Sequence, residues 1–171
     1  INNINTWYEE HLKGNLDAIL SNTSGCGTTM KDYGFIFKDN EKMRKKAKVI
    51  SDLTKDVSEY LNENLKLNFK LKEKKYKIAY HSACSMQHGQ KVHNQPMELL
   101  TKTSNEIMEI PEGHICCGSA GTYNILQTEI AKELLSKKVK NIESLKPDFI
   151  STGNIGCITQ ISNGTKTPIL H

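Results

Sequence analysis

Two adjacent cysteines followed at once by glycine, Cys116-Cys117-Gly118, constrain this chain more than any other stretch of its sequence. A disulfide between neighbouring cysteines is strained, because the two sulfurs lie too close along the chain for relaxed bridge geometry. A soft metal centre uses such a pair better, since both thiols can bind as thiolates while the glycine lets the backbone turn sharply. The alternative is two small buried apolar side chains beside a turn, because free cysteine is often buried. The doublet alone leaves both interpretations open.

The size and charge of the chain limit the classes of protein it can belong to. Its 171 residues suffice for one domain that buries roughly 70% of its unfolded surface. It begins with Ile1 rather than Met, so we expect a piece of a longer protein. No run approaches the roughly 20 apolar residues of a membrane helix, and no signal-peptide pattern opens the chain, so we expect a cytoplasmic protein, or one peripheral on the inner membrane. The net charge is +4, but Arg44 is the only arginine, which argues against a nucleic-acid partner.

The number of cysteines favours metal or redox chemistry over a disulfide framework. There are five, an odd number, and nothing in the sequence suggests secretion. They are Cys26, Cys84, Cys116, Cys117 and Cys157.

Strand-like and helix-like segments alternate along the chain, as in α/β folds. We expect strands at 16–21, 77–80, 106–110 and 148–152, a short last strand at 169–170, and helices at 3–13, 28–37, 97–101 and 128–145. Turns are expected at 22–27 and 153–157. The predicted fold is a Rossmann-like parallel sheet flanked by helices.

Residues 38–75 differ from the rest in being strongly basic. An apolar stripe of Leu53, Val57, Leu61 and Leu65 predicts one helix there, with Ser51 as its cap. The basic residues form either an electropositive surface for an acidic partner or a solvated helical face, and interspersed acidic residues favour the second.

A shift of 131 residues aligns two segments of the sequence. Residues 17–26 then lie on residues 148–157, with Asp, Ile, Gly and Cys identical at four positions. We infer a duplicated cysteine-rich repeat whose first copy is truncated and retains Cys26. The predicted division is residues 1–37 for the end of the first repeat, 38–75 for a basic helical connector and 76–171 for the complete second repeat.

In the complete repeat, 31 residues separate Cys84 from Cys116 and 39 separate Cys117 from Cys157. Each of these positions follows a predicted strand, so a parallel sheet brings the four thiols to one edge. Four thiolates can hold a [4Fe-4S] cluster or one zinc ion, and the lack of a Cys-x-x-Cys pair favours iron–sulfur.

Glycines and histidines near the cysteines extend this candidate site. Backbone N–H groups of Gly-rich turns can face a negative cluster, a role that suits Gly118, Gly121, Gly153 and Gly156. The alternative for these glycines is ordinary turn chemistry. Outer hydrogen bonds to cluster sulfurs are expected from histidines near the cysteines, for which ordinary packing or solvation is the alternative. These are His81, His88 and His114. No Ser-His-Asp grouping, Walker loop, dinucleotide fingerprint or carboxylate pair is found, so no catalytic residue is assigned.

Several stretches together resemble the family of cysteine-rich (CCG) domains, and within it the C-terminal region of glycolate oxidase (glycolate dehydrogenase) iron–sulfur subunits. The most specific is Cys116-Cys-Gly-Ser-Ala-Gly-Thr-Tyr-Asn124, supported by residues 22–34, 80–84, 88–92, 95–100 and 152–157. Gln160 stands where the general pattern has its last cysteine, so four thiolates, enough for an ordinary cubane, remain. Ser82-Ala83 stands where many relatives have Asp-Pro.

The resemblance implies an electron-transfer subunit that is not itself catalytic. It implies FAD-containing glycolate oxidase subunits as partners, an N-terminal ferredoxin-like domain of the same chain that is absent here, and electron flow toward a quinone pool. The expected cofactor is a [4Fe-4S] cluster, which the isolated fragment can lose. Two alternatives stay open: a zinc-stabilised structural or docking module, and a thiol–disulfide reductase of the heterodisulfide-reductase kind.

Overall fold

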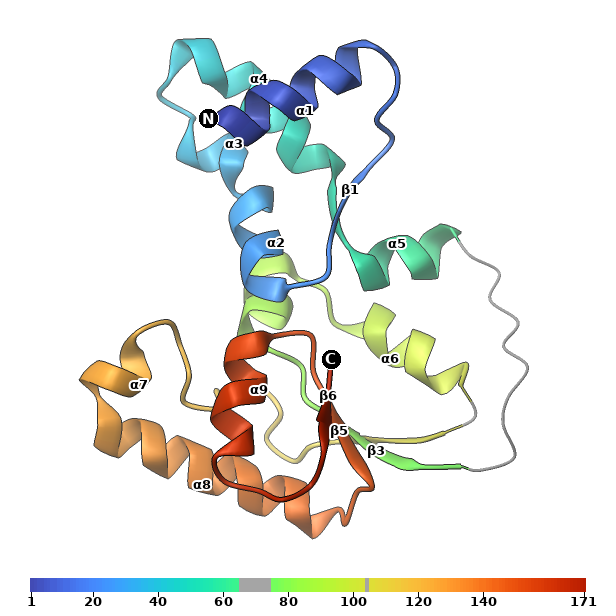
Figure 1. Cartoon of the computed structure of the whole chain (residues 1–171), viewed down its shortest axis with the longest axis vertical. Coiled ribbons are helices and arrows are strands. Elements are labelled where there is room, and N and C mark those ends of the chain that lie inside the picture. Colours follow the sequence, from blue (N-terminus) through green and yellow to red (C-terminus); the bar gives the residue numbers. More distant parts are fainter. Residues whose placement is uncertain (65–74, 104) are drawn as a thin grey trace.

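A four-stranded sheet of parallel strands organises the larger part of the molecule (Figure 1). In this computed structural model, which describes residues 1–64, 75–103 and 105–171, the strand order is β4-β3-β5-β6. The strands are β3 (Lys77–Tyr80), β4 (Glu106–Glu109), β5 (Phe149–Ser151) and β6 (Ile169–Leu170). The predicted α/β class, with a parallel sheet flanked by helices, is therefore confirmed.

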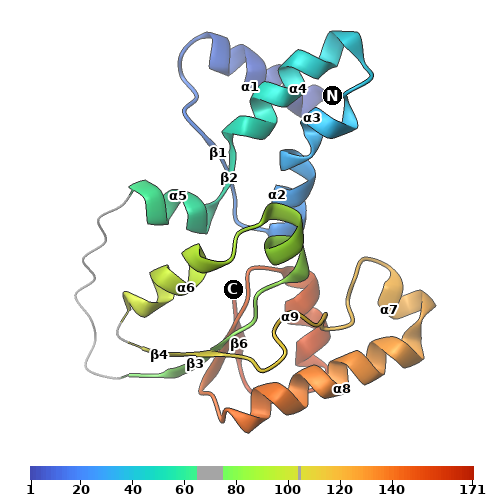
Figure 2. The ribbon, with the colours of Figure 1, turned by 180° about the vertical axis from the view of Figure 1, so that it is seen from behind.

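The strand order makes the sheet doubly wound. From β3 the chain passes to β4 on one side, then crosses back over β3 to β5 and continues to β6. Because such crossovers are right-handed, α6 (Asn94–Thr101) lies on the face opposite α8 (Thr128–Ser144) and α9 (Ile155–Ser162), as Figures 1 and 2 show. The direction of winding reverses between β3 and β5, and in open α/β sheets ligands bind at such a reversal, beyond the carboxyl ends of the strands.

Apolar side chains from the sheet and from α8 and α9 form the core of this part. Ile142 of α8, Ile150 of β5 and Ile161 of α9 are fully buried, and they form one cluster that also includes Cys117 and Cys157. The apolar spacing along residues 128–145 predicts an inner helix face that includes Ile130, Ala131, Val139 and Ile142. The structure confirms Ala131, Val139 and Ile142 as buried, whereas Ile130 is 48% exposed and this part of the prediction is wrong.

The N-terminal part has its own small sheet and its own core. Its elements are α1 (Asn2–Leu12), β1 (Ile19–Ser21), α2 (Ser24–Lys31), α3 (Tyr33–Ile36), α4 (Glu41–Leu53), β2 (Thr54–Asp56) and α5 (Val57–Asn64). Strands β1 and β2 pair in parallel. The buried core residues are Ile4, Ile19, Met43, Ala47 and Ile50.

The two parts share an order of elements. Helix, strand, helix and strand follow one another as α1-β1-α2-β2 and again as α8-β5-α9-β6, with α3 and α4 inserted before β2. Helices α2 and α9 each have eight residues, and Cys26 and Cys157 are each the third residue of their helix. This correspondence supports the proposed repeat; the division at 37/38 and 75/76 stays a prediction.

Strand β2 interrupts the single helix predicted around Leu53 and Val57. The backbone is extended from Thr54 to Asp56, because in this conformation the side chains of both residues are buried and the strand pairs with β1. Ser51 is not a helix cap; it lies within α4, where its hydroxyl accepts from the Gly34 N–H at 2.8 Å. Leu65, the last position of the predicted stripe, lies outside the described residues.

Two segments predicted as turns begin helices, and two further short helices were not predicted. Helices α2 and α9 start at Ser24 and Ile155, because the preceding residues provide extended N-caps. Residues Ser85–Gln90 form the π-helix η1, and Tyr123–Leu126 form α7. The helix predicted at 28–37 is divided into α2 and α3 at Asp32. The helix predicted at 97–101 begins three residues earlier, at Asn94, so that Pro96 is the third residue of α6.

Candidate metal centre

The four cysteines of the complete repeat meet at the carboxyl edge of the sheet. Cys84 follows β3, Cys116 and Cys117 follow β4, and Cys157 lies in the first turn of α9 after β5. All four line one cavity of about 560 Å³. This edge is also where the winding of the sheet reverses, so the thiols occupy the position at which α/β folds bind ligands.

The four thiols lie in a series in which each thiol changes the pKa of its neighbours. The pKa of Cys116 is held well below its usual range, because the thiols of Cys117 and Cys84 donate to its sulfur and the N–H of Gly118 lies 3.3 Å from it. The same contacts raise the pKa of Cys117 and of Cys84, where hydrogen bonding with Cys116 and burial disfavour a second thiolate. A site that favours the thiolate at some of its four sulfurs and disfavours it at the others is suited to a cation that stabilises all four.

His81 lies beside this series of thiols without a hydrogen-bond partner. Its side chain is 2% exposed, and one of its ring nitrogens and the sulfurs of Cys117 and Cys157 all lie within 4.8 Å of one another. Neither nitrogen is hydrogen-bonded to any described residue. Contacts with Cys117 and then with His81 lower the pKa of Cys157 to about 5. Buried polar groups normally have a hydrogen-bond partner. A metal centre held by these thiols would provide the partner that the imidazole of His81 lacks.

The turn of the cysteine doublet requires glycine. Gly118 has a φ of +94°, and a Cβ built there would lie 2.5 Å from the carbonyl oxygen of Ala131 in α8. The side chain of Gln160, the residue that replaces the last cysteine of the general pattern, also lies against this position, and its carbonyl accepts from Asn124. The doublet is thereby packed directly on α8 and α9.

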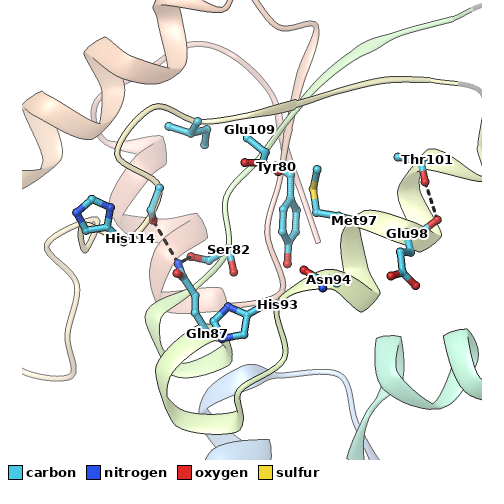
Figure 3. Close-up of a pocket in the computed structure, with 12 residues that line it drawn as sticks. Tyr80, Ser82, Gln87, His93, Asn94, Met97, Glu98, Thr101, Glu109 and His114 are labelled. Carbon is cyan, nitrogen blue, oxygen red and sulfur yellow. Dashed lines mark hydrogen bonds between the residues drawn. The ribbon is translucent and has the colours of Figure 1, made fainter.

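The remaining predicted site residues differ in their positions. Gly156, Gly121 and His88 line the cavity with the cysteines. His114 instead lines a separate cavity of about 520 Å³ (Figure 3). Cys26 is exposed and is not among the residues that line the cysteine cavity, although its neighbour Gly25 is.

A group of polar side chains joins the two parts of the molecule beside the thiols. The Asn154 amide donates to the hydroxyl of Ser24 at 2.8 Å and to that of Ser85 at 3.3 Å, and its oxygen caps α9 by accepting from the Cys157 N–H. The two hydroxyls are 2.8 Å apart. Because Ser85 follows Cys84, this junction fixes the backbone at two of the four thiols. This junction was not predictable from the sequence, since Ser24 lies 61 residues from Ser85.

The sequence did contain a signal for another neighbour of the thiols that our prediction missed. Lys138 is 2% exposed, and its ammonium donates to the carbonyl oxygens of Glu112 and Gly113, just before the doublet. It occupies a position four residues before Ile142 and seven after Ala131, on the inner face of α8. Burial lowers the pKa of Lys138, whereas the sulfurs of Cys117 and its neighbours oppose that shift.

A parallel α/β domain that gathers four thiols at its strand ends defines the class of cysteine-rich metal-binding domains. Residues 78–162 match the model of the CCG family, described as a cysteine-rich domain, and this part of the chain belongs to that family. It is 35% identical over 170 residues to the glycolate oxidase iron-sulfur subunit of Escherichia coli (strain K12), which covers 99% of this chain and 41% of that protein. The predicted likeness to such subunits is confirmed.

Other relatives have related names. The chain is 29% identical over 154 residues to the probable glycolate oxidase iron-sulfur subunit of Bacillus subtilis (strain 168), covering 87% of this chain and 34% of the relative. It is 24% identical over 151 residues to lactate utilization protein A of Geobacillus sp. (strain WCH70), covering 88% and 63%. The chain thus spans less than two thirds of the length of each of these relatives. No helix among the described residues is long and apolar enough to span a membrane.

Proposed function

We propose that this chain binds a [4Fe-4S] cluster and carries electrons in a complex that oxidises glycolate or a related 2-hydroxy acid. The ligands are Cys84, Cys116, Cys117 and Cys157. The observation that carries this proposal is the single cavity that all four thiols line, although they come from three separate segments of the chain. The names of the relatives, iron-sulfur subunits of glycolate oxidase and lactate utilization proteins, support the same cofactor and the same class of reaction.

The bound cluster would accept one electron and pass it on, while the residues of this chain hold and shield it. Cys117 and Cys157 are almost fully buried, which keeps water from one side of the cluster. The N–H of Gly118 already points at a sulfur, and His81 would donate to another. His88, which also lines the cavity, would donate a hydrogen bond to a cluster sulfur. Because Gly156 has no side chain, the start of α9 could lie close to the cluster. Such hydrogen bonds to sulfur stabilise the thiolates and tune the reduction potential.

The proposed partners follow from the relatives and from the family. Flavin chemistry on the 2-hydroxy acid belongs to FAD-containing subunits of the complex, and this chain is its non-catalytic electron-transfer subunit. An N-terminal ferredoxin-like domain of the same protein would supply further clusters, and the electrons would pass toward the quinone pool. The proposed location is the cytoplasm, peripheral to the inner membrane.

Iron and acid-labile sulfide, measured on protein prepared without oxygen, test this proposal. We expect equal amounts of iron and sulfide in the wild-type chain, and loss of most of both when any one of the four ligands is changed to serine. Cys26→Ser is the matched control, because this exposed thiol is not among the residues lining the cavity, and it should retain the wild-type content. One zinc ion per chain without sulfide would support the zinc-stabilised docking module instead. Disulfide reduction that is sensitive to alkylation in metal-free protein would support the thiol reductase.

A further inference from the structure

The cavity of the thiols has no counter-charge in its own wall. Among the described residues that line it, none is Lys, Arg, Asp or Glu, and His88 is the only titratable side chain besides the cysteines. A cubane held by four thiolates is an anion, and it gains a further negative charge on reduction. Burying such a charge without a compensating cation is costly.

Lys138 is a buried cation that does not line the cavity but contacts the turn before the cysteine doublet. Its side chain extends from the inner face of α8 toward the turn that leads into the doublet, where Nζ lies 3.2 Å from the Glu112 carbonyl oxygen and 3.5 Å from that of Gly113. Gly113 precedes Cys116 by three residues. Burial lowers the pKa of this ammonium, and the sulfurs of Cys117, Cys116 and Cys157 oppose that shift.

The neighbours of Lys138 on α8 hold the same turn but carry no buried charge. Lys137 forms an ion pair with the carboxylate of Glu112 at 2.7 Å, and its side chain is 51% exposed. The amide of Asn141 donates to the Pro111 carbonyl at 2.8 Å and to the other carboxylate oxygen of Glu112 at 3.1 Å. Three residues of α8 therefore anchor the turn, and only Lys138 is also buried. This difference allows anchoring and charge to be tested separately.

We infer that Lys138 is a positioning residue for the cluster, whose buried positive charge raises the reduction potential of the cluster while its hydrogen bonds fix the turn before the doublet. This role rests on the proposed function, because it requires a cluster on the four thiolates. A cation near the cluster stabilises the reduced form more than the oxidised form, since the reduced form carries more negative charge. Removing the cation therefore lowers the potential.

Redox titration of the anaerobic protein, followed by the electron paramagnetic resonance of the reduced cluster, tests this inference. Lys138→Gln keeps a donor for the two carbonyls but removes the charge, and Lys138→Met removes both. We expect both variants to have a lower potential, with the ratio of reduced to oxidised cluster falling roughly tenfold at a fixed potential, as for one unit charge at several ångströms in a partly buried site. Lys138→Arg, which keeps the charge, should return the potential toward the wild-type value.

Lys137→Met is the matched control, because it removes a neighbouring lysine that holds the same turn from the surface. Its potential should equal that of the wild type, since exposed ion pairs are screened by solvent. Equal potentials in the wild type and in Lys138→Gln, with full cluster content in both, would overturn the role of Lys138 and leave the proposed function standing. A wild-type chain that binds no iron and sulfide would overturn both. A shift in Lys137→Met as large as in Lys138→Gln would assign the effect to the turn rather than to the buried charge.

Discussion

Replacing Gly118 by alanine tests whether the turn of the cysteine doublet is fixed by its contact with α8. The φ of +94° lies in a region that L-residues rarely adopt, and forcing alanine into it costs about 1–3 kcal/mol. The new Cβ would also lie 2.5 Å from the carbonyl oxygen of Ala131, a backbone atom inside a helix that cannot move aside alone. Overpacking of this kind costs a further 1–3 kcal/mol or so. We expect Gly118→Ala to reduce the free energy of unfolding by about 2–6 kcal/mol.

Gly121 offers a control that separates the two effects. It also has a positive φ, +59°, but nothing lies within 4 Å of a Cβ built there. Gly121→Ala should therefore show the backbone effect alone, at about 1–2 kcal/mol. Urea unfolding followed by far-ultraviolet circular dichroism measures the stability of both variants, and iron content reports whether each variant binds the proposed cluster as the wild type does. If Gly118→Ala were no less stable than Gly121→Ala, the contact with Ala131 would not fix the turn.

Two further predictions concern the junction and the metal. Asn154→Ala should reduce the free energy of unfolding by about 1–3 kcal/mol, because it removes the cap of α9 and the bonds to Ser24 and Ser85. Asn163→Ala, at the exposed end of α9, should change it by less than about 0.5 kcal/mol in the same urea titration, and equal effects would contradict the argument. Removing the metal with a chelator should lower the melting temperature by roughly 10 °C, because a bound metal adds several kcal/mol. In a calorimeter the Cys84→Ser variant should show no such change, and a similar drop there would refute this explanation.

The parts of the site that depend on local pattern were predictable from the sequence. Buried strands followed by cysteines, as at Tyr80 and Cys84, place thiols at one edge of a parallel sheet by geometry alone. Helix α9 was missed and the start of α2 was predicted four residues too late, because glycine and asparagine indicate turns and do not show whether a helix begins at the next residue. Strand β2 was missed because Thr54 and Asp56 become buried only when β1 is beside them.

The parts that depend on contacts between distant segments were not predictable. Ser24 reads as an ordinary turn residue until the fold brings it to Asn154, 130 residues away. Lys138 had one signal, its position on the inner face of α8, but the sequence did not show that the carbonyl groups before the doublet would accept from it there. In both cases a polar side chain is buried because a specific partner satisfies it, and a single sequence does not contain that partnership.

Both parts of the molecule line the cavity of the thiols, since Gly25 at the start of α2 lies in its wall together with residues of the second repeat. Any change that draws the two parts away from each other therefore uncovers sulfur to oxidants, even when every cysteine is intact. Resistance to air would then depend on how firmly the two parts are held together, and substitutions at Ser24 or Gly25, which come from the first repeat, should make a bound cluster more sensitive to oxygen.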